Sequence, residues 1–261
     1  MTNDFNLSEI VIPNETKHQI YLDGAQPTVT ETGKLLGRIP RAINAAFAPL
    51  DIWIEKQEYN IKRTKELLNE NMKNVNPEKI VPPEPYVAVP AIASLSYSMD
   101  SDELRKMYAN LLSKAIYSDT KDSVHPAFTE IIKNLSPLDC KLFNAIMSTP
   151  THQIGCYEIR FGKSLSSYSV LFPYVTEYTF DSPEKICASI DNLERNKLIA
   201  SKDFHYNNDD IYEPIRNTDT YKQLVAIPEE AETHRKIIPY KISIKSTYLG
   251  QAFYEICSKP L

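Results

Sequence analysis

Residues 99–146 read MDSDELRKMYANLLSKAIYSDTKDSVHPAFTEIIKNLSPLDCKLFNAI, and this stretch decides the fold of the first half of the chain. Its first part predicts an amphipathic helix capped by Ser101, because apolar side chains recur there at three- and four-residue spacing. The apolar positions of this helix are Leu104, Met107, Tyr108, Leu111, Leu112, Ala115 and Ile116. Further on, Ser136, Pro137 and Asp139 form a capped helix start, in which Asp139 can reach back to the cap amide. The stretch therefore predicts a helical core.

The sequence before this stretch predicts further helix. A helix expected over residues 50–72 has a narrow apolar stripe, which would pack on one neighbouring helix or form a coiled-coil seam with a second copy. Residues 76–85 contain four prolines and predict an extended connector. We expect a flexible leader at residues 1–26 and a helical domain at residues 27–135.

The sequence after residue 135 mixes helix and strand signals. Ser182 and Pro183 open a capped helix, and residues 240–245 alternate apolar and polar side chains, as in a half-buried strand. The run IDNLERNKLIAS, this alternating strand and the phrase STYLGQAFYEIC together resemble a winged-helix arrangement, although its second helix is not obvious. We therefore expect a mainly α protein, in which the helical domain is followed by a winged-helix-like α+β domain at residues 136–261.

The composition narrows the classes of function. The chain has 261 residues, a formal net charge of −5 and a pI of about 5.6, and this acidic balance gives no general support for nucleic-acid binding. The six glycines form no phosphate-binding loop. The four cysteines are far apart and include no CxxC pair, so we expect buried thiols rather than a metal site or disulfides. No cofactor is expected.

The first residues are polar and lack the apolar run of a signal peptide. The most apolar region, Leu35 to Ile54, contains Arg38, Arg41 and Asp51, which argue against a membrane-spanning helix. We expect a cytoplasmic protein. Residues 33–54 could also form an amphipathic element on a membrane surface, but packing against protein is the preferred interpretation.

Four motifs resemble the signature of the abortive infection alpha family, a bacterial family formerly described as a domain of unknown function. The motifs are Asp102-Glu103 at a helix start, Ala109-Asn110-Leu111-Leu112, His125-Pro126-Ala127-Phe128, and the run from Leu135 to Asp139. The upstream run PPEPYVAVPAIASLSY is similar to the family as well, so the resemblance covers roughly residues 30–147. It implies a role in bacterial defence against phage. It implies no mechanism, because it supplies no catalytic residues to carry over.

The candidate functional residues are Asn110, His125, Pro126, Phe128 and Asp139. His125 could act as a general base, but that role needs a positioned partner and a pocket, so capping or packing is the preferred interpretation. Asn110 interrupts an apolar stripe, and a hydrogen bond to neighbouring backbone explains it better than contact with a substrate. A triad of Ser136, His125 and Asp139 is not expected, because capping already explains Ser136. We therefore expect no catalytic centre.

DNA binding is the alternative function. The helix expected at residues 183–197 carries three basic and three acidic side chains, whereas a DNA-reading helix presents a positive face to phosphate. The candidate nucleic-acid contacts are Lys236, Lys241 and Lys245 near the expected wing. We expect phage defence through a protein partner or self-association. A DNA-binding transcriptional regulator is the alternative, and an unrecognised enzyme is a third possibility.

Overall fold

The computed structural model describes residues 59, 62–73, 75–95, 101–202 and 208–261. The chain divides into two units, Met1–Ile54 and Glu55–Leu261, and all described residues belong to the second. The leader expected at residues 1–26 and the amphipathic element expected at residues 33–54 lie outside the described residues. Of the helix expected over residues 50–72, the described residues 59 and 62–71 are helical.

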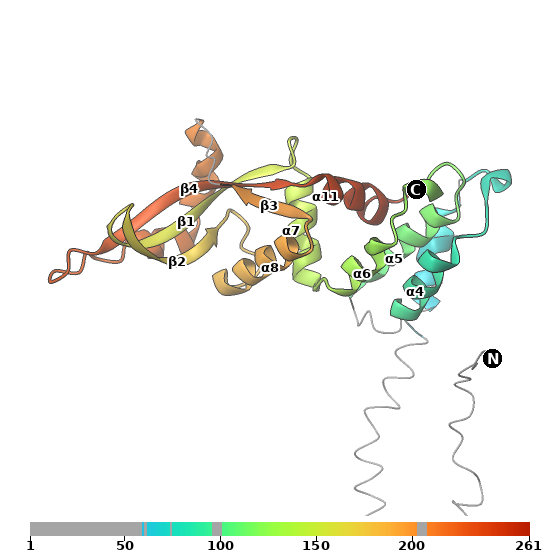
Figure 1. Cartoon of the computed structure of the whole chain (residues 1–261), viewed down its shortest axis with the longest axis horizontal. Helices are drawn as coiled ribbons and strands as arrows, with labels where there is room; N and C mark the ends of the chain where they lie inside the picture. The colour runs from blue at the N-terminus through green and yellow to red at the C-terminus, as the bar shows by residue number, and fades with distance from the viewer. Residues whose placement is uncertain (1–58, 60–61, 74, 96–100, 203–207) are drawn as a thin grey trace, which may run out of the picture. The chain divides into compact units, whose positions relative to one another are not determined.

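The helical half of the described chain surrounds one central helix, α5 (Figure 1). The helices here are α4 (Pro85–Leu95), α5 (Asp102–Ala115), α6 (Ala127–Lys133) and α7 (Pro137–Met147), with 3-10 turns at Pro77–Lys79 and Lys121–Ser123. α5 begins where the sequence predicts, because Ser101 Oγ accepts a hydrogen bond from Leu104 N at 3.3 Å. Its apolar stripe is confirmed as core from Leu104 to Ala115, and Leu111 at its centre is fully buried, whereas Ile116 caps the end of the helix and is only partly buried.

The second half is built on a four-stranded antiparallel sheet of order β2-β1-β4-β3. The strands are β1 (Gln153–Ser164), β2 (Ser167–Val175), β3 (Ile199–Lys202) and β4 (Lys236–Ser246). The helices are α8 (Pro183–Arg195), α9 (Glu213–Arg216), α10 (Asp219–Val225) and α11 (Tyr248–Phe253), with a 3-10 turn at Asp209–Tyr212 and a π-helical turn at Tyr254–Ser258. β1 and β4 are the two central strands, and their long pairing organises this half.

The expectation of a mainly α protein with a winged-helix-like second half is wrong, because the described chain is α+β. A winged helix would place a further helix between α7 and α8, where the chain forms the β1–β2 hairpin instead. The composition of this segment explains the difference. GCYEIRF in β1 and SYSVLFPYV in β2 are rich in β-branched and aromatic side chains, which favour strands over helices.

The sheet is covered on both faces. Successive residues of a strand point to opposite faces, so Ile154 and Cys156 join the main core with α7 and α8, while Tyr157 and Ile159 join a smaller cluster. That smaller cluster includes Tyr212, from the segment between β3 and β4. The main core contains residues from both sides of the domain boundary expected at residues 135 and 136. The division into those two domains stays a prediction.

Tyr108 makes the stability of the protein sensitive to alkaline pH. Its side chain is 1% exposed, and burial raises its pKa to about 12, above the value of 10.0 expected for a free tyrosine. Because the folded-state pKa is the higher one, the stabilisation is complete below pH 10 and is lost as the pH rises towards 12. The free energy of unfolding should fall by up to about 1.4 kcal/mol per pH unit from this group.

Urea titrations of the wild type and Tyr108→Phe from about pH 8 to pH 11 would measure this effect. The wild type should lose stability more steeply than the variant above pH 10. Other titrating groups contribute to both proteins and therefore cancel in the comparison. Parallel pH profiles would show that the Tyr108 pKa is not raised.

Candidate functional site

α7 begins with a capping box formed by Ser136 and Asp139. Asp139 N donates a hydrogen bond to Ser136 Oγ at 3.2 Å, and Ser136 N donates one to Asp139 Oδ2 at 2.7 Å. Pro137 occupies the first turn, where its missing amide hydrogen is not needed. The capping box predicted from the sequence is confirmed.

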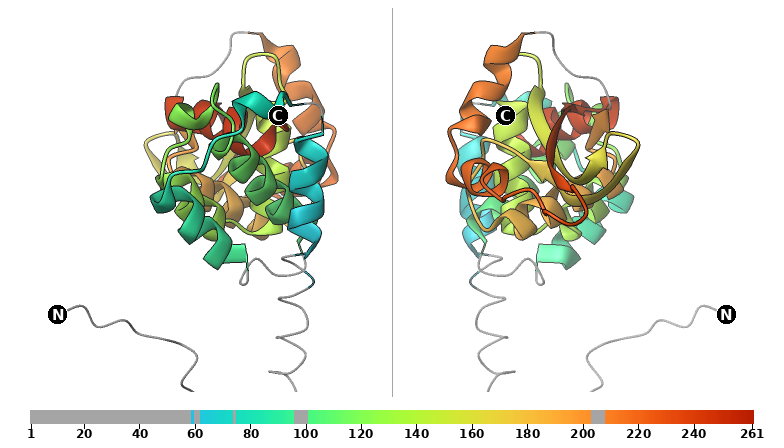
Figure 2. Two further views of the ribbon diagram at one scale, coloured as in Figure 1. Left: turned by 90° about the vertical axis from the view of Figure 1, so that its right-hand side faces the viewer. Right: turned by 90° about the vertical axis from the view of Figure 1, so that its left-hand side faces the viewer.

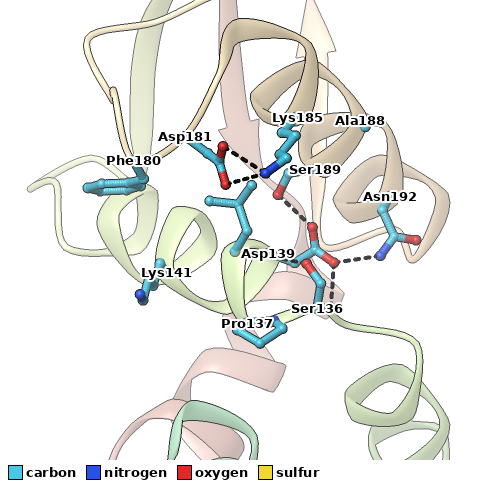
Figure 3. A pocket seen from close by; sticks show the side chains of 11 residues that line it. Ser136, Pro137, Asp139, Lys141, Phe180, Asp181, Lys185, Ala188, Ser189 and Asn192 are labelled. Carbon is cyan, nitrogen blue, oxygen red and sulfur yellow. Dashed lines mark hydrogen bonds and ion pairs between the residues drawn. The ribbon is translucent and has the colours of Figure 1, made fainter. Parts of the chain in front are cut away.

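The Asp139 carboxylate also binds two side chains of α8 (Figure 3). Ser189 Oγ donates to Asp139 Oδ1 at 2.5 Å, and Asn192 Nδ2 donates to Asp139 Oδ2 at 2.8 Å. Asn192 Nδ2 also donates to Asn134 O at 2.8 Å. The Asp139 side chain is only 3% exposed, and its carboxylate accepts hydrogen bonds from three donors, which compensate for its burial. We call Ser136, Asp139, Ser189 and Asn192 the Asp139 junction, because they join α7 to α8.

An open groove of about 540 Å³ lies beside this junction, between α7 and α8. We call it the α7–α8 groove. Its apolar wall is formed by Pro137, Leu138, Phe180 and Ala188, and its charged lining residues besides Asp139 are Lys141, Asp181 and Lys185 (Figure 3). Phe180 is 49% exposed and stacks on Tyr178, with ring centroids 5.5 Å apart and an interplanar angle of 17°. The groove therefore combines an apolar wall with charged side chains around it.

The charged side chains around this groove form ion pairs that are partly exposed to solvent. Lys185 Nζ lies 3.0 Å from Asp181 Oδ1, and the Ser182 amide, followed by Lys185, lowers the pKa of Asp181. Lys141 Nζ lies 3.8 Å from Glu103 Oε1, and both side chains are partly exposed. Exposed pairs of this kind contribute little to stability. They can therefore exchange partners when another molecule binds.

Asn110 and Lys114, both on α5, attach the C-terminal segment to this helix. The two segments lie side by side (Figure 2). Asn110 Nδ2 donates to Cys257 O at 2.9 Å, and Asn110 Oδ1 accepts from Asn71 Nδ2 at 2.8 Å. The buried Lys114 ammonium donates to Lys259 O at 2.8 Å and to Glu255 O, and burial lowers its pKa. A cation at these carbonyls suits the C-terminal end of a helical segment. The side chains of Asn110 and Lys114 therefore both bind backbone carbonyl groups of the C-terminal segment.

The HPAF motif forms the start of α6. His125 Nδ1 accepts a hydrogen bond from Ala127 N at 3.1 Å, and Pro126 directly precedes the helix. Phe128 is 1% exposed, and its ring meets that of Phe253 edge-on at 5.5 Å. Among the described residues, no hydrogen bond connects His125 with Asp139, so the structure does not assemble these two candidates into one site.

The three candidate lysines lie on β4, a central strand of the sheet. They do not form one basic strip, because they differ in the face of the sheet to which they point and in their partners. Lys236 is exposed at the beginning of β4, and its side chain points to the opposite face of the sheet from those of Lys241 and Lys245. Lys241 forms an ion pair with Asp209, which raises the pKa of Lys241. Lys245 lies near the end of the strand, opposite Gln153 of β1 and Ala200 of β3.

The four cysteines are buried and unpaired with one another, as the sequence predicts. Burial raises the pKa of each thiol, so none has the low pKa of a reactive cysteine. In the described part of the chain, no group of three or more histidine, cysteine and carboxylate side chains is placed to hold a metal ion. The same part contains no helix long and apolar enough to cross a bilayer.

Sequence reasoning missed the residues of α8 that complete the junction. Ser189 and Asn192 are three residues apart on one helix face, and this spacing was the available signal. Their common partner Asp139 is 50 and 53 residues away in sequence, so only the tertiary fold brings them together.

Asp139→Ala should lower the free energy of unfolding by about 2–3 kcal/mol, because it leaves buried donors on α7 and α8 without an acceptor. Asp139→Asn keeps one acceptor oxygen and should lose less. Chemical denaturation of the wild type and both variants measures the difference. A loss below about 0.5 kcal/mol for Asp139→Ala would mean that the junction does not stabilise the fold.

No curated protein matches this chain. One solved structure is similar, the uncharacterized protein from the hydrocarbon-degrading marine bacterium Alcanivorax borkumensis SK2, at 13% identity and a TM-score of 0.33, covering 51% of this chain and 96% of that chain. The family model for abortive infection alpha matches residues 56–257, and so continues well beyond residue 147, where the resemblance seen in the sequence ends. This chain therefore belongs to the abortive infection alpha family.

Proposed function

We propose that this protein limits phage growth in the bacterial cytoplasm by abortive infection, that it acts by binding a protein partner, and that it is not an enzyme. Membership of the abortive infection alpha family is the observation that carries the defence role. Abortive infection means that an infected cell dies or stalls before phage is released, so the protein must act on, or sense, a component of the infected cell.

The hydrogen bonds of the candidate residues Asp139 and His125 support a function without catalysis. The Asp139 carboxylate is buried and holds three donors, and His125 Nδ1 accepts the Ala127 amide. A general base needs an available position beside the proton that it removes. These two side chains are instead used to fix α7 and α6.

The α7–α8 groove is the surface that we propose for the partner. Its occupant would be a protein segment that places an apolar side chain between Leu138 and Phe180 and an acidic side chain near Lys141. The apolar wall gives the contact its affinity, and the loosely paired Lys141 gives it a charge preference. The groove is fixed by the Asp139 junction, so the partner meets a preformed surface.

The DNA-binding alternative has less support. Lys241 already forms an ion pair with Asp209, and Lys185 on α8 with Asp181. Sequence-specific duplex binding relies on several phosphate contacts from lysine and arginine side chains, together with a helix or strand that enters a groove. The described surface of α8 does not favour that use.

The defence role is tested by challenging bacteria that carry or lack the gene with a panel of phages. The expected result is a lower phage yield with poor survival of infected cells, for at least one phage of the panel. A lower yield with full survival of the infected cells would argue for a different kind of defence. Equal yields over a broad panel would contradict the defence role.

A further inference from the structure

A second groove, of about 370 Å³, lies at the end of the sheet where β1 begins and β4 ends. We call it the sheet-end groove. The side chains that matter here are Gln153, Lys202, Lys245, Tyr248 and Gln251. They come from β1, β3, β4 and α11, so the groove is formed by segments far apart in sequence. It shares no lining residue with the α7–α8 groove.

Strand register places the two lysines on one face of the sheet. Lys245 pairs with Gln153 on one side and with Ala200 on the other, so these three residues form a row across three strands. Lys202 is two residues beyond Ala200 and points to the same face. The neighbouring Ile244 points to the other face and is buried in the core. The small Ala200 leaves open space between the two lysine side chains.

The charge of the sheet-end groove is the reverse of the charge of the whole chain. Two ammonium groups line it, and among the described residues no carboxylate side chain does, although the net charge of the chain is −5. Within the same described residues, neither Lys202 nor Lys245 takes part in an ion pair, in contrast to Lys241 with Asp209. Two lysines on one wall repel each other, and an anion between them removes that repulsion.

An aromatic ring stands beside these charges. Tyr248 is 92% exposed, the most exposed of the large apolar and aromatic side chains in the described chain. Thr247 caps α11 by accepting a hydrogen bond from Gly250 N at 2.9 Å, and so fixes the backbone that carries Tyr248. Gln251 Nε2 donates to Ser246 Oγ at 3.0 Å, which orients its amide at the groove. An exposed ring on a capped helix start, beside cations, is an arrangement on which an unpaired base can stack.

We propose that the sheet-end groove binds a nucleotide, with the phosphate between Lys202 and Lys245 and the base stacked on Tyr248. The groove volume is within the range of small-molecule sites. Ammonium groups bind phosphate through charge-assisted hydrogen bonds. The nucleotide can be free or part of a single strand, since both offer one phosphate and one unstacked base. In a duplex the base faces are covered by their neighbours, so Tyr248 has nothing to stack on.

Fluorescence anisotropy on the full chain tests this proposal, with a labelled oligothymidylate as the single-stranded probe. ATP and AMP serve as competitors, and a duplex of the same length as the contrasting probe. Lys202→Glu with Lys245→Glu should weaken binding by at least about tenfold, and Tyr248→Ala by about five- to tenfold. Displacement by a mononucleotide at concentrations comparable to the oligonucleotide identifies a free nucleotide as the ligand. Binding of the oligonucleotide alone identifies a single strand.

Matched controls separate this site from general charge effects. Lys236→Glu makes, at the other end of β4, the same charge change as Lys245→Glu alone, so these two single variants are compared directly, and Tyr86→Ala removes a ring that is 59% exposed on α4. Both controls should bind within about twofold of the wild type, and thermal melting should show that all variants are folded. The proposal is overturned if neither probe nor mononucleotide binds, if the duplex binds as well as the single strand, or if the controls lose as much affinity as the groove variants. This outcome is independent of the phage assay, because it requires no protein partner.

Discussion

Gly250→Ala should lower the free energy of unfolding by more than about 3 kcal/mol, above the usual range for adding a methyl group to a packed core. A Cβ atom at Gly250 would lie 1.9 Å from Leu198 O and 2.8 Å from Leu198 C. Both atoms are backbone, so no side-chain rotation relieves the overlap. Alanine is normally favoured over glycine in a helix by about 1 kcal/mol, and the overlap must exceed that gain. We expect α11 to move away from Leu198, the residue directly before β3.

Gly155→Ala is the matched control, because it makes the same chemical change at a buried glycine. A Cβ there would approach Ile211 Cγ2 and Tyr212 Cε1 at 3.1 Å, so the overlap is much smaller than at Gly250 and is with side-chain rather than backbone atoms. Its loss should be about 1 kcal/mol or less. Urea titrations of the two variants measure the contrast. Equal losses, or a loss under about 1 kcal/mol for Gly250→Ala, would show that α11 does not pack on Leu198 as described.

Leu111→Ala should lower the free energy of unfolding by about 2–5 kcal/mol. Leu111 is at the centre of α5, its side chain is 0% exposed, and it belongs to the main hydrophobic core. Truncation removes buried apolar surface and leaves a cavity that the surrounding helices close only in part. Because the main core includes residues of the sheet as well as of the helices, the loss should appear in one cooperative unfolding transition.

Lys106→Ala is the control on the same helix. Lys106 is exposed on α5, so its truncation should change the stability by less than about 0.5 kcal/mol. Denaturation followed by circular dichroism gives both values. If Leu111→Ala and Lys106→Ala behave alike, α5 is not the central helix of this fold.

Local signals in the sequence predicted the helical half well. Ser101 and Ser136 both cap the helices that were expected from them, because a cap requires only residues three positions apart. The second half was predicted less well, since the winged-helix interpretation depended on the order of elements rather than on a local signal. The β-branched and aromatic residues of β1 and β2 favoured a hairpin, and that hairpin replaces the helix which the interpretation required.

The residues that come together at the two grooves could not be predicted from the sequence. Asp139 was singled out as a helix cap, but its role in joining α7 to α8 depends on Ser189, 50 residues away. Likewise, Lys202 and Lys245 share a face only because β3 and β4 pair in one particular register. A shift of one residue would send either lysine to the opposite face. Capping and periodicity are local, whereas both surfaces depend on tertiary pairing.

The proposed function places the defence activity of the protein in the α7–α8 groove. Lys141→Glu with Phe180→Ala changes this groove, and Lys133→Glu with Leu165→Ala is its matched control. Lys133 and Lys141 are similarly exposed and pair with glutamates at 3.7 Å and 3.8 Å. Leu165 is 57% exposed and Phe180 49%. All four changes lie on the surface, so both proteins should fold.

The most direct measurement is phage yield per infected cell, with survival of the infected cells followed in the same cultures. It uses a phage that the wild-type protein restricts, and immunoblots confirm equal protein levels. The groove variant should release as much phage as cells without the gene, while the control variant should restrict phage as the wild type does. Full restriction by the groove variant would contradict the claim.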